Sequence, residues 1–166
     1  MASLGLSAIL PLVPVVSSTC SLWFAWDQYE FLTIFHKPGL RQSSSEILTP
    51  YFTIFFNRGA PRVLALISTT AFSCGAILRN SPGTALQDSG AYSWYLSGLL
   101  CAVGHMAWAP LILPYIRALQ GNESAKEKKV AELETWLRIH TWRSLTVDLA
   151  AWVCCITATV KSLSLE

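Results

Sequence analysis

Four long stretches of this 166-residue chain carry almost no charged side chains. They cover residues 1–26, 63–78, 89–116 and 144–160, and only the last holds a charge, that of Asp148. A helix that crosses a bilayer needs about 20 mostly apolar residues, and charged residues at the ends of a shorter helix extend toward the headgroups. The pattern predicts an all-α fold, an integral membrane four-helix bundle that forms a single domain over residues 1–166.

The expected spans cover about residues 4–26, 61–79, 91–116 and 142–160, with loops at 27–60 and 117–141. Helices are expected in lipid because each helix satisfies its own backbone polar groups. Only 13% of the residues are charged, against about 25% in an ordinary soluble domain. The net charge of +2 and the lack of a long basic block also disfavour a nucleic-acid partner.

The orientation follows from the lysines and arginines. Ten of the 12 lie in or next to the two long loops, and the other two are Arg79 and Lys161. The positive-inside rule therefore predicts that both loops are cytosolic and both termini lumenal. Asn122 begins an Asn-Glu-Ser glycosylation motif, and on the cytosolic side we expect it to stay unmodified.

Cysteine and histidine spacing gives no sign of redox or metal chemistry. The five cysteines lie in or beside the apolar stretches without a CxxC pair, which favours buried structural thiols. His36, His105 and His140 lie on different elements, and no HExxH motif occurs, so no metal site is expected.

Ionisable residues within the spans are the strongest functional candidates, because such groups are costly in lipid and usually face a cavity or a partner. His105 lies on one stripe of the third span, where it either holds helices together or takes part in chemistry. Trp136, His140 and Arg143 share one side of the helix that leads into the fourth span, and Asp148 continues this side. Arg143 and Asp148 are five residues apart, a poor spacing for an ion pair in a regular helix, so each is expected to pair with another helix.

Two prolines, Pro110 and Pro114, lie near the cytosolic end of the third span. Proline removes a backbone hydrogen bond and bends a helix. We therefore expect a kink and a cavity beside the fourth helix.

Three motifs carry a family resemblance: the aromatic run from Tyr51 to Arg62, the run from Gly104 to Pro110, and the spacing of Trp136, His140 and Arg143. With the four spans, they resemble the fungal anthrone oxygenase-like family. The resemblance implies a small membrane enzyme of polyketide biosynthesis, a monooxygenase that oxidises an anthrone to an anthraquinone without a cofactor. It also implies localisation to the endoplasmic reticulum.

The resemblance implies a role for each candidate residue. His105 or His140 would act as the base, Arg143 would bind the resulting anion, and Asp148 would orient them. The substrate-binding candidates are Trp108, Trp136, Arg58 and Tyr51. The implied partners are an apolar aromatic polyketide and the lipid bilayer; whether a second copy or a pathway protein also binds stays open.

Two other functions fit the same sequence. A membrane cyclase or isomerase, or an accessory subunit, acting on an apolar polyketide or terpenoid would use the same acid–base residues. A non-enzymatic membrane scaffold would use small residues such as Ser97, Cys101 and Gly104 only to pack helices.

Overall fold

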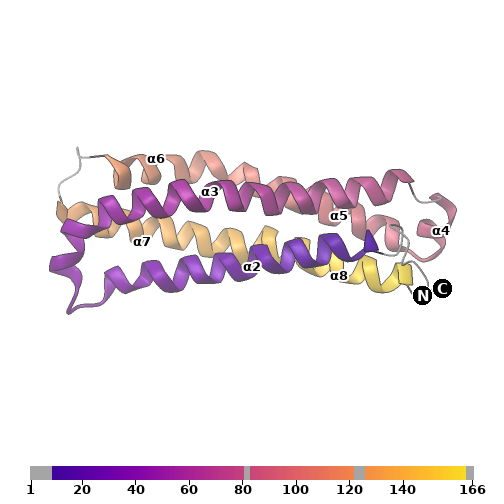
Figure 1. The fold of residues 1–166 in the computed structure, drawn as a ribbon, viewed down its shortest axis with the longest axis horizontal. Helices are drawn as coiled ribbons and strands as arrows, with labels where there is room; N and C mark the ends of the chain where they lie inside the picture. The colour runs from indigo at the N-terminus through magenta and orange to yellow at the C-terminus, as the bar shows by residue number, and fades with distance from the viewer. Residues whose placement is uncertain (1–8, 81–82, 122–125, 164–166) are drawn as a thin grey trace.

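The computed structural model describes residues 9–80, 83–121 and 126–163 (Figure 1). Within these ranges the chain is helical and contains no strand, which confirms the all-α prediction for the described residues. In chain order, the elements are α2 (Leu12–Thr33), η1 (Ile34–His36), α3 (Arg41–Asn80), α4 (Gly83–Asp88), α5 (Ala91–Gly104), η2 (His105–Trp108), α6 (Ala109–Gln120), α7 (Lys126–Arg143), η3 (Ser144–Asp148) and α8 (Leu149–Leu163).

The long helices lie lengthwise beside one another in an elongated bundle (Figure 1). The segments α5, η2 and α6 follow one another along one line, as do α7, η3 and α8. Helix α5 packs against α8 and α3, and α3 also packs against α2. The start of α2 and the end of α8 lie at the same end of the bundle (Figure 1).

Three helical runs among the described residues are long and apolar enough to cross a membrane: Glu46–Asn80, Ala91–Gln120 and Lys128–Leu163. They contain the second, third and fourth expected spans. The first expected span, residues 4–26, lies partly outside the described residues. A count of four spans therefore stays a prediction.

Much of the two expected loops is helical instead. Helix α3 runs for 40 residues and passes through Pro50 and Pro61, so it includes the second half of the expected loop at 27–60. Helix α7 likewise fills most of the loop expected at 117–141. The reason is packing: Leu48, Phe52 and Leu133 are fully buried in one cluster formed by these segments. An apolar stripe at helical spacing outweighs the local cost of the prolines.

A second cluster holds the other end of the bundle together around Cys74, Tyr95 and Cys155. The sulfur atoms of Cys74 and Cys155 are 3.8 Å apart, and both thiols are free. The expectation of buried thiols holds for these two and for Cys154, whereas Cys20 is exposed.

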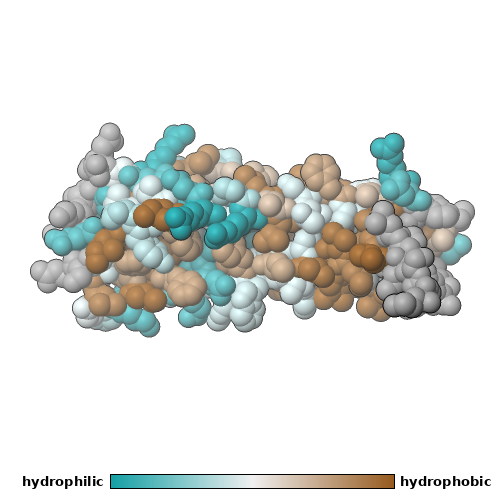
Figure 2. All heavy atoms as spheres, viewed as in Figure 1, coloured by the Kyte–Doolittle hydropathy of each residue, from teal (hydrophilic) through white to brown (hydrophobic). Residues whose placement is uncertain are grey.

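Polarity differs between the two halves of the bundle. On the face shown in Figure 2, hydrophilic residues are more frequent over the half with α6 and α7 than over the half with α5 and α8. In α3 no charged residue lies between Arg62 and Arg79, and the run from α5 to α6 has none before Arg117. The more apolar half is therefore the part best suited to lipid.

Candidate active site

A buried carboxylate joins two helical runs near the middle of the bundle. The Oδ1 atom of Asp148 lies 2.7 Å from Nδ1 of His105, and its Oδ2 atom accepts a hydrogen bond of 3.3 Å from Nε of Arg143. Each of the three residues is at most 7% exposed. Buried charges are stable only when they are paired and hydrogen-bonded, and here one carboxylate serves both partners.

The pair of Arg143 and Asp148 depends on a short π-helix, Ser144–Asp148. The sequence spacing of five residues predicted that each would pair only with another helix. This was right for the contact of Asp148 with His105 and wrong for its contact with Arg143. In a π-helix residues i and i+5 are hydrogen-bonded neighbours, so the spacing that is poor in an α-helix becomes favourable. Such single turns often mark functional sites.

The two buried histidines differ in whether one of their ring nitrogens is free to bind a ligand. In His140, Nε2 lies 3.0 Å from the carbonyl oxygen of Ala25, and Nδ1 lies 3.0 Å from Nη2 of Arg143. Since a carbonyl only accepts and a guanidinium only donates, Nε2 carries the proton and both nitrogens are occupied. In His105, Nδ1 faces Asp148, and the described residues offer Nε2 no hydrogen bond. His105 is therefore the histidine with a nitrogen available to a ligand.

Trp136 fixes the other side of this network. Its ring stacks on His140 with centroids 4.9 Å apart and an angle of 12° between the planes. Phe52 meets the Trp136 ring edge-on at 5.6 Å. The Nε1 atom of Trp136 is buried and has no hydrogen-bond partner in the part of the chain that the structure describes.

A cavity of about 300 Å³ opens between α3 and the η2–α6 segment. Gln28, His105, Trp136 and Arg143 supply its polar groups and are all buried. The exposed side chains of Leu64 and Met106 border it as well, so the cavity opens at the bundle surface. The remaining wall is formed by apolar residues of α3, η2 and α6: Phe55, Phe56, Ala60, Val63, Leu64, Met106, Ala109, Ile112, Leu113 and Ile116.

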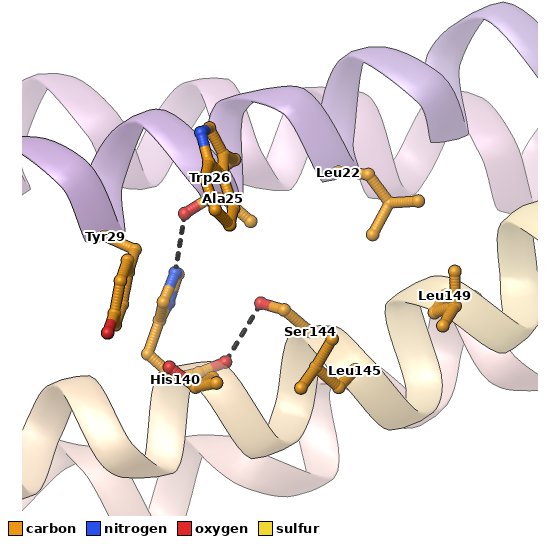
Figure 3. Close-up of a pocket in the computed structure, with 9 residues that line it drawn as sticks. Leu22, Ala25, Trp26, Tyr29, His140, Ser144, Leu145 and Leu149 are labelled. Carbon is orange, nitrogen blue, oxygen red and sulfur yellow. Dashed lines mark hydrogen bonds between the residues drawn. The ribbon is translucent and has the colours of Figure 1, made fainter.

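A second cavity of about 360 Å³ lies between α2 and the α7–η3 segment and borders His140, which the first cavity does not (Figure 3). Ser144 donates a hydrogen bond of 2.9 Å to the backbone oxygen of His140. Trp26, Leu145 and other mostly apolar side chains form its wall. His105 and Arg143 line the first cavity and neither lines the second, so we place the candidate active site at the first one.

The structure brings together the four acid–base candidates, His105, His140, Arg143 and Asp148, and one of the substrate-binding candidates, Trp136. The other three do not line the first cavity. Arg58 and Tyr51 are exposed on α3, and Trp108 is half-buried in η2. Asn122 lies outside the described residues.

The expected break in the third span is present, but it starts before the prolines. The chain narrows to a 3₁₀-helix at His105–Trp108, and Pro110 follows at the start of α6. The first cavity borders this break on the side of α3. Gln28, Phe55 and Phe56 also line this cavity, and none of them was identified as a site residue from the sequence. The aromatic pair at 55 and 56 is evident in the sequence, but the sequence did not show which side of the helix faces the cavity.

Metal binding has no support in the described part of the chain, because no group of three or more His, Cys, Asp or Glu side chains there is placed to hold an ion. The chemistry that the arrangement itself allows is acid–base. A histidine backed by a carboxylate can accept a proton, and a neighbouring arginine can bind the resulting anion.

Known proteins resemble the chain over nearly its full length. The probable epoxidase scpX of Mollisia scopiformis is 32% identical over 158 residues, which cover 93% of this chain and 96% of that protein. The epoxidase pydX of Acremonium sp is 30% identical, with 93% and 94% covered. The oxaleimides biosynthesis cluster protein N of Penicillium oxalicum is 25% identical, with 93% and 90% covered.

No family model matches the chain, and no solved structure matches it. The names of the three relatives refer to epoxidation and to a biosynthesis cluster, and none of them mentions an anthrone. They agree with the fungal secondary metabolism that the sequence implied. The chain belongs to the family of fungal secondary-metabolism proteins that includes these epoxidases.

Proposed function

We propose that this protein is a membrane oxygenase that forms an epoxide on an apolar intermediate of fungal secondary metabolism, a polyketide in particular. The observation that carries the proposal is the buried cluster of His105, Asp148 and Arg143 beside an otherwise apolar cavity. The names of the relatives supply the reaction type. The endoplasmic reticulum, with both termini lumenal, is the proposed location.

The substrate class follows from the electron balance. Epoxidation by O₂ places one oxygen atom in the epoxide and releases the other as water, which requires two electrons and two protons. A substrate with an ionisable enol or phenol conjugated to the double bond supplies both. It loses two hydrogens and gains one oxygen atom in the net reaction.

The residues fit this sequence of steps. Nε2 of His105 takes the acidic proton, while Asp148 stabilises the imidazolium and Arg143 stabilises the substrate anion. The anion then reacts with O₂ to form a carbon-bound peroxide. The peroxide transfers its outer oxygen to the neighbouring double bond as the O–O bond breaks, which leaves an alkoxide on carbon. The imidazolium of His105 returns its proton to this alkoxide. Elimination of the resulting hydroxyl with a hydrogen of the adjacent carbon then breaks the C–O bond, forms a new double bond and releases water.

An anthrone belongs to the same substrate class, since its acidic methylene also yields an electron-rich anion. Its oxidation to an anthraquinone has the same net change, a loss of two hydrogens and a gain of one oxygen. Anthrone oxidation is therefore the alternative that the same three residues support.

The test begins with deletion of the gene in the fungus that carries it and isolation of the compound that accumulates. Microsomes from yeast that express the chain are then given this compound under ¹⁸O₂. We expect a product that has lost two hydrogens and gained one labelled oxygen, and NMR of its carbons separates an epoxide from a quinone. A product of unchanged mass would overturn the proposal in favour of a cyclase or isomerase, and no product would favour a scaffold.

A further inference from the structure

The polar end of the first cavity contains more hydrogen-bonding capacity than the protein itself uses. Gln28 on α2 is only 7% exposed and lines this cavity. Within the described ranges its side chain makes no hydrogen bond. The amide of Gln28 is therefore free to form a hydrogen bond with a molecule inside the cavity.

The guanidinium of Arg143 also has N–H groups to spare. Its Nε binds Asp148 and its Nη2 binds His140, and the described residues provide no acceptor for Nη1. A guanidinium has five donors and stays charged in proteins. Arg143 lines the same cavity as Gln28, and no Asp, Glu or Lys borders that cavity.

The charges of the site balance both without a ligand and with an acidic one. In the empty site the positive charge of Arg143 is compensated by Asp148, and Asp148 also holds His105. If a ligand hydroxyl passes its proton to His105, the imidazolium pairs with Asp148 and the oxyanion pairs with Arg143. Two ion pairs then replace one, and the net charge of the buried site does not change.

We propose that Gln28 and Arg143 form an oxyanion-binding site that selects apolar phenols and enols over the corresponding ethers. Gln28 is a positioning residue whose amide donates to the ligand oxygen beside the guanidinium. The aromatic and aliphatic wall of the cavity contacts the rest of the ligand. The inference rests on the proposed function for the location of the site and adds the chemical group by which the substrate is recognised.

Binding of 2-naphthol and 2-methoxynaphthalene to the full chain in lipid nanodiscs tests this proposal without any turnover. Naphtholate and neutral naphthol differ in absorption and fluorescence, so the bound form can be read directly. We expect 2-naphthol to bind at least about tenfold more tightly than its methyl ether, the scale of one hydrogen bond to a charged group. We also expect it to be bound as naphtholate at pH 7, where the free phenol is neutral.

Three variants make the test specific. Gln28→Leu removes the amide at similar volume and should weaken naphthol binding by about tenfold while leaving binding of the ether unchanged. Gln28→Glu adds a negative charge and should abolish naphtholate binding. Gln120→Leu is the matched control, because Gln120 lies on α6 outside the cavity and bonds only Asn57.

Equal affinity for naphthol and its ether, or bound naphthol that remains neutral, would overturn the oxyanion site. So would a Gln28→Leu variant that binds like the Gln120→Leu control. None of these measurements involves oxygen transfer, so naphtholate binding without any ¹⁸O-labelled product would reject the proposed oxygenase and retain the binding site.

Discussion

Asp148 is the residue on which the buried cluster depends, because it is the partner of both His105 and Arg143. Asp148→Asn keeps the shape of the side chain and removes its charge. We expect oxygen-transfer activity to fall by about 10- to 100-fold, the usual cost of losing a group that orients its neighbours. The measurement is the rate of labelled product formation in microsomes at equal protein level.

The same change leaves the buried charge of Arg143 without compensation, which costs about 3–5 kcal/mol. The thermal unfolding temperature in detergent should therefore fall as well. Thr146→Val is the control, because Thr146 is exposed in the same π-helix and bonds only backbone oxygens. An Asp148→Asn protein with full activity would show that the cluster has only a structural role.

His105 and His140 should respond differently to the same substitution. His105→Gln removes the proposed base and should lower turnover by about 10²- to 10⁴-fold. His140→Gln retains an amide that can bond Ala25, so we expect a smaller loss together with weaker binding, since Arg143 loses its support. Separate measurement of kcat and KM checks this, and an equal loss in both variants would contradict the distinction.

The charged part of the site could be predicted from sequence because ionisable residues are rare at membrane depth. Gln28 could not, since an uncharged polar residue gives no comparable signal. Arg58 and Tyr51 do not line the first cavity, and their position could not be predicted while residues 27–60 were interpreted as a loop. Once α3 is continuous, Phe56, Ala60 and Val63 share its cavity face, and Arg58 falls on the other side.

At the scale of elements, the helices of the apolar half were predictable from sequence, whereas the continuation of α3 through the expected loop was not. The uncharged stretches identified the helices of the apolar half, because lipid requires satisfied backbone groups. The continuity of α3 through Pro50 and Pro61 depends on burial of its N-terminal half against α7, which involves residues about 80 positions apart in sequence. No local pattern reports such a contact.

Close packing of α5 on α8 provides a test at this scale. A Cβ atom at Gly98 would lie 3.1 Å from Sγ of Cys155 and 3.5 Å from Cβ of Cys154. Gly98→Ala should therefore separate the helices slightly and destabilise the protein by about 1–3 kcal/mol, as overpacking does. Thermal unfolding in detergent measures the effect.

Gly104→Ala is the matched control on the same helix. Its Cβ would have Val147 as nearest neighbour, at 3.9 Å, which is an ordinary contact. Alanine is also the better helix former, by about 1 kcal/mol. Equal unfolding temperatures for the two variants would show that α5 and α8 are not tightly packed at Gly98.

The whole molecule is longer than a membrane is thick. Helix α3 has 40 residues, which at about 1.5 Å per residue gives roughly 60 Å against about 30 Å of hydrocarbon. In a bilayer, about half of a bundle of this length would project from the lipid, and the half with α7 carries most of the charge. We propose that His105 and Asp148 lie near the boundary of the bilayer, where an apolar substrate can reach them from lipid.

The orientation of this projecting half can be tested with glycosylation. The ends of α6 and α7 at Gln120 and Lys126 lie far from the apolar half (Figure 1). If that end faced the lumen, Asn122 would be within reach of the glycosylation machinery. We propose that it faces the cytosol and expect Asn122 to stay unmodified, while an acceptor in a flexible C-terminal extension becomes glycosylated. A gel-mobility shift of the protein that is sensitive to endoglycosidase and disappears in Asn122→Gln would show the opposite orientation. The control is the same extension with Gln in place of its acceptor Asn.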